Sequence, residues 1–242
     1  MKGIILAGGK GTRLFPLTKV TNKHLLPVGR VPMIFHAVKQ LAGSGITEIM
    51  VVTSTEHMGD IVRCLGSGED FGCTFSYKVQ EKPLGIAHAL SLASGFARGE
   101  RVIVILADNI FGSSIRPVID HFIEQKEGAR VVLKKVSDPT RYGVAALDEK
   151  QVIAIEEKPK QPPSDYAVVG LYCYDEKVFD MLEHLQFSDR GELEITSLNK
   201  EYIQKHQMEY EIYEGDWMDA GTPESWFEAN RMFFDKDGHT EP

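Results

Sequence analysis

Short apolar runs rich in β-branched residues alternate along this chain with segments of helical periodicity. Runs of this length and composition are typical of buried strands. We expect strands at 3–6, 49–53, 75–79, 102–106, 131–136, 152–155 and 168–174, and helices at 33–42, 58–65, 86–97, 115–127, 177–185, 193–206 and 223–234. Alternation of this kind produces βαβ units, so we predict an α/β protein with a mixed, mostly parallel sheet flanked by helices.

The alternation is regular over about residues 1–128 and changes after that point. In the second half, about 129–236, the strands follow one another more closely and a proline-rich loop occupies 159–163. A chain of 242 residues can bury a full hydrophobic core without disulfide bonds or structural metal ions. We therefore predict a single domain over 1–242 that consists of these two halves and a polar tail at 237–242.

Charge is distributed unevenly along the chain. The formal net charge is −8, which argues against nucleic-acid or anionic-membrane partners. Residues 1–47 nevertheless contain seven basic residues and no acidic one, whereas the rest of the chain carries 20 basic and 35 acidic residues. A positive segment in an acidic protein favours the capture of a compact polyanion rather than a long one.

The three cysteines, Cys64, Cys73 and Cys173, are odd in number and show no C-x-x-C spacing. We expect reduced, buried thiols rather than a disulfide framework or a zinc site. The apolar run at the N-terminus is too short for a signal peptide or a membrane span, so we expect a cytoplasmic protein.

The first predicted strand leads directly into the sequence AGGKGTRLFPLT at residues 7–18. A strand, a glycine-rich turn and a helix together offer backbone N–H groups to phosphate. The dinucleotide pattern G-x-G-x-x-G fails because Leu14 stands where the third glycine should be. The P-loop pattern G-x-x-x-x-G-K-[S/T] fails as well, because no glycine in the chain is followed by Lys and then Ser or Thr. The segment instead predicts an extended phosphate-binding loop, in which Arg13 can hold two phosphate oxygens.

The sequence up to residue 29 resembles the signature of the sugar-nucleotide pyrophosphorylases, and most closely the short-form glucose-1-phosphate thymidylyltransferases among them. Further motifs follow in family order as ILADN, RYGVA, IEEKP, RGELEIT and WMDAGTPES. The resemblance extends over almost the whole chain. It implies the Rossmann-like nucleotide-diphospho-sugar transferase fold, with the nucleotide in the first half and the sugar phosphate in the second.

The resemblance implies that glucose 1-phosphate attacks the α-phosphorus of dTTP in line, which gives dTDP-glucose and pyrophosphate. The second pKa of a sugar phosphate is about 6, so the nucleophile is already an anion and needs no general base. Catalysis then depends on positioning two anions and neutralising their charge. Arg13 and Lys23 would hold the triphosphate, while Lys158 and Arg190 would hold the sugar phosphate.

Two carboxylates stand in the context of a Mg²⁺ site. Asp108 follows the strand 102–106, at the end where open α/β sheets place ligands. Asp219 precedes a helix that Thr222 is expected to cap and that begins with Pro223. Magnesium prefers one or two carboxylates together with phosphate oxygens and water. Arg13, Lys23, Asp108, Lys158 and Asp219 thus form the expected catalytic set.

The remaining binding positions follow from the resemblance. For the nucleotide they are Leu6, Ala7, Gly8, Gly9, Gly11, Thr12, Gln80 and Gly85, beside Arg13, Lys23 and Asp108. The Gln80 amide offers one donor and one acceptor, which suits N3–H and a carbonyl of thymine or uracil. For the sugar phosphate they are Gly143, Glu157, Val169, Gly170 and Trp217, beside Lys158 and Arg190.

Alternatives remain open at this point. UTP or another hexose 1-phosphate could replace the expected substrates, because thymine and uracil differ by one methyl group. The chain departs from the family's usual residues at Ala107, at His88 in place of a common glutamine, and at Val169 in place of a frequent threonine. A non-catalytic nucleotide-sugar sensor on the same fold is the third possibility. A homo-oligomer is expected. The regulatory nucleotide site that longer relatives build with further C-terminal helices, and the oligomer that those helices help to form, are not expected here.

Overall fold

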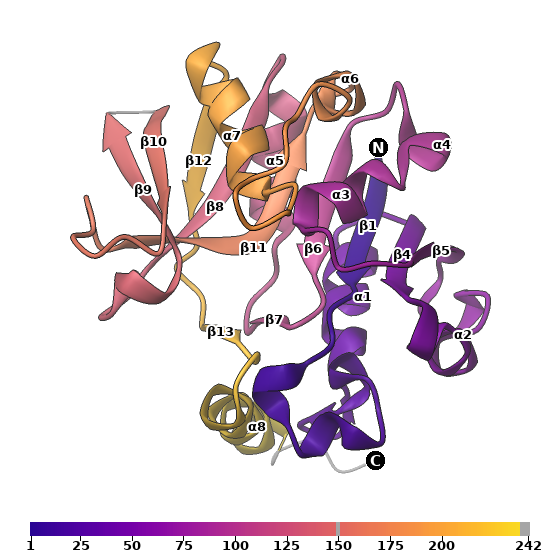
Figure 1. Cartoon of the computed structure of the whole chain (residues 1–242). Coiled ribbons are helices and arrows are strands. Elements are labelled where there is room, and N and C mark those ends of the chain that lie inside the picture. Colours follow the sequence, from indigo (N-terminus) through magenta and orange to yellow (C-terminus); the bar gives the residue numbers. More distant parts are fainter. Residues whose placement is uncertain (149–150, 238–242) are drawn as a thin grey trace.

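The computed structural model describes residues 1–148 and 151–237. Its centre is a mixed sheet with helices packed on both faces (Figure 1). The strands lie in the order β5-β4-β1-β6-β11-β8-β12-β10-β9. Their bounds are β1 Lys2–Ala7, β4 Glu48–Ser54, β5 Thr74–Gln80, β6 Val102–Leu106, β8 Ala129–Lys135, β9 Gly143–Asp148, β10 Gln151–Glu157, β11 Tyr166–Tyr174 and β12 Met208–Ile212. The predicted α/β class is confirmed.

The two halves of the sheet differ in strand direction. Strands β5, β4, β1 and β6 are parallel to one another, as βαβ alternation predicts. β11 is antiparallel to both β6 and β8, and β10 is antiparallel to β9 and β12. β8 and β12 are again parallel. Parallel pairing therefore dominates the first half of the chain, while short connections in the second half permit antiparallel neighbours.

Alternate side chains of each central strand enter two different cores. In β1, Ile4 and Leu6 belong to one cluster, whereas Ile5 and Ala7 belong to the other. The first cluster is covered by α3 Ile86–Ser91, α4 Ser94–Ala97, α6 Val178–Leu182 and α7 Ile195–Gln204. The second is covered by α1 Met33–Gly43, α2 Met58–Leu65 and α5 Arg116–Glu124. The result is a three-layer arrangement.

The helix predicted at 86–97 is divided into α3 and α4. The Ser91 hydroxyl donates a hydrogen bond to the carbonyl oxygen of His88 (2.8 Å). A serine that bonds back to the preceding turn competes with the regular helical ladder. The chain therefore makes a turn at residues 92–93 before α4 begins.

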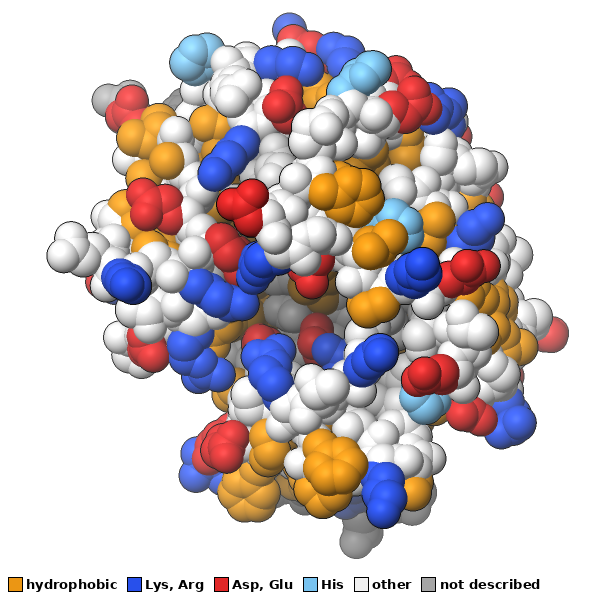
Figure 2. Space-filling view, viewed as in Figure 1, with side chains coloured by type: hydrophobic (Ala, Val, Ile, Leu, Met, Phe, Trp, Pro, Cys, Tyr) orange, Lys and Arg blue, Asp and Glu red, His pale blue; other side chains and the backbone are white. Residues whose placement is uncertain are grey.

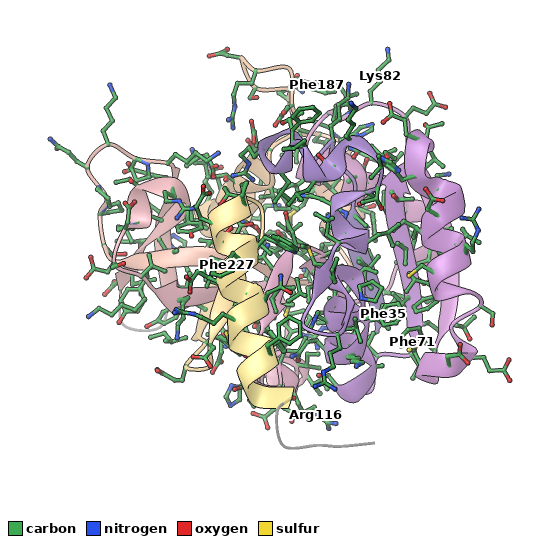
Figure 3. All side chains as sticks on the ribbon, turned by 90° about the horizontal axis from the view of Figure 1, so that it is seen from below. Phe35, Phe71, Lys82, Arg116, Phe187 and Phe227 are labelled. Atoms are coloured by element: carbon green, nitrogen blue, oxygen red, sulfur yellow. The ribbon has the colours of Figure 1, made fainter. Side chains whose placement is uncertain are left out.

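Smaller elements surround the carboxyl ends of the parallel strands. The hairpin of β2 Pro27–Val28 and β3 Val31–Pro32 packs against α8 Pro223–Asp237, and β7 Asn109–Phe111 pairs with β13 Trp217–Asp219. The short 3-10 helices are η1 Thr12–Leu14, η2 Leu17–Lys19, η3 Lys23–Leu25, η4 Thr55–His57, η5 Glu69–Phe71 and η6 Pro139–Arg141. Figure 3, seen from below, shows α8 in front of the other elements, with Phe227 exposed on it.

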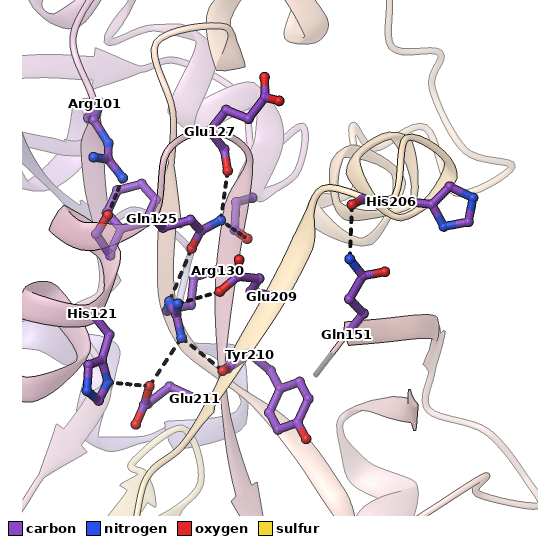
Figure 4. A network of polar contacts seen from close by, with 12 residues as sticks. Arg101, His121, Gln125, Glu127, Arg130, Gln151, His206, Glu209, Tyr210 and Glu211 are labelled. Atoms are coloured by element: carbon purple, nitrogen blue, oxygen red, sulfur yellow. Dashed lines mark hydrogen bonds and ion pairs between the residues drawn. The ribbon is translucent and has the colours of Figure 1, made fainter. Parts of the chain in front are cut away.

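A polar network fixes β12 beside β8 (Figure 4). The buried Arg130 guanidinium donates to Glu209 (2.6 Å), to Glu211 (3.2 Å) and to the Tyr210 carbonyl oxygen (3.0 Å). His121 of α5 contacts Glu211 as well (2.8 Å). Since β12 continues into β13, this network anchors the segment that carries Asp219.

Other predictions concern the cysteines, the tail and membranes. Cys64, Cys73 and Cys173 are free, as expected from their spacing, and Cys73 and Cys173 are buried, whereas Cys64 is half-buried, contrary to the expectation. Of the tail predicted at 237–242, only residue 237 is described, as the last residue of α8, and the rest lies outside the described residues. Within residues 1–148 and 151–237, no helix has the length and apolar character needed to cross a bilayer.

Candidate active site

A cleft of about 440 Å³ opens at the carboxyl ends of β1, β5, β6 and β10. Figure 2 shows a hollow on this face with basic and acidic side chains around it. The cleft brings together residues predicted from both halves of the chain, namely Leu6, Gly8, Gly9, Arg13, Lys23, Gln80, Gly85, Asp108, Glu157, Lys158, Arg190 and Asp219. Open parallel sheets place ligands at this edge, so the location agrees with the position expected for Asp108.

The glycine loop begins where β1 ends. Gly11 has φ 60°, and a Cβ atom there would lie 2.8 Å from the Thr18 side chain. The Thr18 hydroxyl also donates to the Gly11 carbonyl oxygen (2.9 Å), which closes the loop. Only glycine accommodates both the left-handed backbone and the close approach. The loop is followed by η1, which carries Arg13 with its side chain exposed toward the cleft.

Asp108 forms a buried ion pair with Lys23. The Lys23 ammonium donates to Asp108 Oδ2 (2.5 Å), and both side chains are nearly buried. Burial by itself would raise the pKa of Asp108, but the charge and hydrogen bond of Lys23 hold that pKa well below its usual range. Asn109 donates a further hydrogen bond to Oδ1 (3.1 Å). Asp108 is therefore an anion in the folded protein.

Asp219 approaches Asp108 because β13 pairs with β7, which places Asp219 opposite Asn109. The backbone N–H of Ala220 donates to the Asp108 carbonyl oxygen (2.8 Å). Burial, together with the negative charge of Asp108, raises the pKa of Asp219 to about 6. Its Oδ1 atom is buried and accepts no hydrogen bond within the described residues. Lys23 thus balances the charge of Asp108, but no ion pair or hydrogen bond within the described residues satisfies Asp219 Oδ1.

These features fit a site for a divalent cation whose coordination shell is completed by oxygen atoms of the substrate. A buried carboxylate oxygen without a partner and a raised carboxyl pKa both indicate room for a positive ligand. No group of three or more His, Cys, Asp or Glu side chains suited to a metal occurs in the part of the chain that the structure describes. Two carboxylates agree with Mg²⁺, which takes its other ligands from water and phosphate oxygens.

The helix after Asp219 begins as expected. The Thr222 hydroxyl accepts a hydrogen bond from the backbone N–H of Ser225 (3.3 Å), and α8 starts with Pro223. A Cβ atom at Gly221 would lie 2.8 Å from Asp219 Oδ1 and 2.9 Å from a terminal nitrogen of Arg13. Gly221 therefore lets the carboxylate and the guanidinium lie close together.

Glu157 and Lys158 reach the other side of the cleft from the end of β10. Lys158 has φ 47°, and its backbone N–H donates to the Tyr142 carbonyl oxygen (2.9 Å). A positive φ is rare for a residue with a side chain and marks local strain, which is concentrated at functional sites. The Lys158 ammonium lies 3.5 Å from Glu157 Oε1, and the side chain is 57% exposed. Its charge is accessible to a ligand.

Arg190 lines the cleft but is already engaged. Its guanidinium donates twice to Glu194 Oε1 (3.2 and 2.8 Å), which the Ser188 hydroxyl also contacts (3.0 Å). The Arg190 side chain is 56% exposed. Since its charge is balanced by Glu194, Lys158 is the less neutralised of the two predicted sugar-phosphate cations.

Several predicted residues do not line the cleft: Ala7, Gly11, Thr12, Gly143, Val169, Gly170 and Trp217. The side chains of Ala7 and Val169 are fully buried in the core cluster against α1 and α5, so a ligand contact at these positions would have to come from backbone atoms. Successive residues of a strand point to opposite faces, so Val169 faces the core. Gly143 instead leaves space for Glu157, whose Oε2 would lie 3.3 Å from a Cβ atom at that position.

Asn109 connects Gly170 and Trp217 to the site, a role that the sequence did not suggest. Its side-chain oxygen accepts hydrogen bonds from the Gly170 N–H (3.0 Å) and from the Trp217 indole N–H (2.9 Å). Its nitrogen donates to Asp108, as described above. The other lining residues not predicted are His24, Pro83, Ile86, Ala89, Leu106, Glu192 and Glu194.

His24 lies beneath the cleft and was not assigned a role. It is 1% exposed, and Nδ1 lies 2.8 Å from Asn22 Oδ1. Burial and then the charge of Lys23 lower its pKa to about 3. His24 is therefore neutral and adds no charge beside the Lys23–Asp108 pair.

Comparison with known proteins identifies relatives that cover nearly the whole chain. The sequence model of the family described as "Nucleotidyl transferase" matches residues 2–236. The glucose-1-phosphate thymidylyltransferase of Neisseria meningitidis is 42% identical over 233 residues, which is 95% of this chain and 81% of that protein. The Xanthomonas campestris protein of the same name is 42% identical over 232 residues, covering 94% of this chain and 79% of its own.

Solved structures agree in fold. A Bacillus anthracis crystal structure, described as a candidate glucose-1-phosphate thymidylyltransferase in complex with a sucrose, is 55% identical, with a TM-score of 0.93 and coverage of 97% of this chain and 96% of that one. A UDP-glucose pyrophosphorylase complexed with UDP-glucose is 25% identical, with a TM-score of 0.86, covering 97% and 98%.

Proposed function

The chain belongs to the nucleotidyl transferase family, and on that basis we propose that it transfers a thymidylyl group from dTTP to glucose 1-phosphate, giving dTDP-glucose and pyrophosphate. The observation that carries the proposal is the cleft itself. Arg13, Lys23 and Lys158 surround two carboxylates, Asp108 and Asp219, at its floor and rim. Relatives named for this reaction support the choice of substrates.

The reaction is an in-line displacement. A phosphate oxygen of the sugar phosphate forms a bond to the α-phosphorus, while the bond from that phosphorus to the bridging oxygen breaks and pyrophosphate departs. Arg13 and the N–H groups of the glycine loop neutralise the departing pyrophosphate, and Lys158 holds the incoming phosphate. Holding both anions in line removes most of the entropic cost of their encounter.

Asp108 and Asp219 would hold Mg²⁺, which when bound would neutralise triphosphate oxygens and orient them for attack. The Lys23 ammonium is paired with Asp108, so it would place positive charge beside the phosphates that the metal holds. Gln80 at the far end of the cleft would contact the base. UTP differs from dTTP by a methyl group only, and discrimination between the two is therefore expected to be modest.

A grid of nucleotides and sugar phosphates tests the proposal. Pyrophosphate release is measured with Mg²⁺, crossing dTTP and UTP with glucose 1-phosphate and other hexose 1-phosphates. Fast release with dTTP and glucose 1-phosphate is expected. Nucleotide binding without release across the whole grid would favour the sensor alternative.

A pair of variants links release to the cleft. Arg13→Ala should reduce turnover by about 10²-fold or more, because it removes a charged donor from the departing group. Lys10→Ala is the matched control, since Lys10 is an exposed cation of the same loop and does not line the cleft. Equal losses in both variants would contradict a specific role for Arg13.

A further inference from the structure

Gln80, at the end of β5, presents one particular side of its amide to the cleft. The residue is 7% exposed and lines the cleft. Its Oε1 atom would lie 3.0 Å from a Cβ atom placed on Gly8. The carbonyl oxygen of the side chain therefore faces the glycine loop, where the proposed function locates the nucleotide.

The nitrogen of the same amide faces away from the loop. Gln80 Nε2 lies 3.1 Å from the Gly85 carbonyl oxygen and 2.9 Å from His88 Nδ1. A backbone carbonyl oxygen only accepts hydrogen bonds, so the amide nitrogen, and not the oxygen, must face Gly85. The second N–H of Gln80 is then directed at His88. Nδ1 of that imidazole must accept, which places the ring proton on Nε2.

We propose that His88 is a positioning residue for base selection, acting through Gln80. With both amide N–H groups engaged, Gln80 has only its carbonyl oxygen to offer a nucleobase. An acceptor at this point pairs with a base that carries a ring N–H, as thymine and uracil do at N3. It opposes cytosine, whose N3 is itself an acceptor.

Loss of the His88 acceptor leaves one buried N–H of Gln80 without a partner. The Gly85 carbonyl oxygen still accepts the other N–H, so the amide is then held by one hydrogen bond instead of two and its carbonyl oxygen is fixed less firmly toward the glycine loop. An acceptor that is held less firmly would weaken the binding of thymine, whereas cytosine, which gains nothing from that acceptor, would not be weakened. Glutamine at position 88 retains an acceptor oxygen and is the conservative replacement.

The test is calorimetric titration of the full chain with dTTP and with dCTP, which needs no turnover. His88→Leu should raise the Kd for dTTP by about three- to tenfold, the equivalent of one neutral hydrogen bond. The Kd for dCTP should stay level, so that the preference for dTTP narrows. His88→Gln should retain the wild-type preference. His88→Met gives a second variant without the ring acceptor, should His88→Leu fail to fold.

Equal weakening of both nucleotides in His88→Leu would overturn the proposal, because it would indicate lost packing rather than an amide that is held less firmly. So would a His88→Gln variant that loses as much preference as His88→Leu. In steady state, the expected effect lies in the KM for dTTP, with kcat and the KM for sugar phosphate unchanged. The inference builds on the proposed function, but wild-type binding of dTTP without pyrophosphate release would refute only the transfer reaction.

Discussion

Lys158 gives a test in which backbone strain and charge can be separated. An L-residue in the left-handed region costs about 1–2 kcal/mol. Replacement by glycine relieves that cost but increases the entropy of the unfolded chain by about 0.4–1 kcal/mol. The half-exposed ion pair with Glu157 contributes little, because exposed pairs are worth about 0–1 kcal/mol. Lys158→Gly should therefore stabilise the protein by about 0.5 kcal/mol while it removes the ammonium group.

Activity should change in the opposite direction. Loss of a charged donor to phosphate costs about 10²-fold or more in turnover. Lys158→Ala removes the same charge without relieving the backbone, so it should be equally inactive and less stable than Lys158→Gly. It should also weaken use of the sugar phosphate far more than triphosphate binding. His206 is the matched control, because it has φ 56° and is exposed outside the cleft.

Urea unfolding and pyrophosphate release are measured on the wild type and on the Lys158→Gly, Lys158→Ala and His206→Gly variants. His206→Gly should gain stability by a similar amount and retain full activity. A Lys158→Gly variant no more stable than Lys158→Ala would show that the positive φ stores no strain. Retained turnover in either Lys158 variant would remove this residue from the phosphate site.

Three further outcomes are expected. Asp219→Asn should abolish most Mg²⁺-dependent turnover while circular dichroism shows an intact fold, and near-normal rates would exclude it from the metal site. The His24 pKa falls from 6.5 to about 3 on folding, so the unfolded chain binds the extra proton between these values and stability declines as pH falls from 6.5. His24→Gln should make that decline shallower by up to about 1.4 kcal/mol per pH unit in urea titrations, and an identical slope would refute the buried neutral imidazole. Gly170→Ala places a Cβ atom 2.7 Å from the Asn109 side chain and should cost about 1–3 kcal/mol in urea unfolding, whereas wild-type stability would mean that Asn109 can move freely.

The parallel half of the sheet was predictable because β1, β4 and β6 contain continuous apolar runs and β5 alternates Phe, Tyr and Val with polar residues. The runs expected at 3–6, 49–53, 75–79 and 102–106 all lie within observed strands. By contrast β9, β12 and β13 were not predicted. β12 alternates apolar residues with two glutamates and β13 has only three residues, so neither shows the continuous apolar run from which most of the others were recognised. Their positions depend on pairing with distant strands.

The same distinction applies to the site. Arg13, Lys23 and Asp108 were predictable because each lies in or beside a local motif at the end of a strand. The function of Asn109 depends on Gly170 and Trp217, which are 61 and 108 residues away along the chain. No local pattern encodes such a contact. Val169 shows a different limit, since a motif gives a position in the chain but not the face of the strand on which its side chain lies.

The contact between α8 and the β2–β3 hairpin determines when this protein can become functional during its synthesis. Trp226 donates to the Pro27 carbonyl oxygen (2.8 Å), and Asn230 accepts from the Gly29 N–H (3.1 Å), across 199 and 201 residues. Domains whose decisive contacts are this distant in sequence complete their folding late. A nascent chain that has emerged only as far as β12 already has the glycine loop but lacks Asp219. The ribosome must therefore release the chain beyond β13 before a triphosphate can meet both carboxylates.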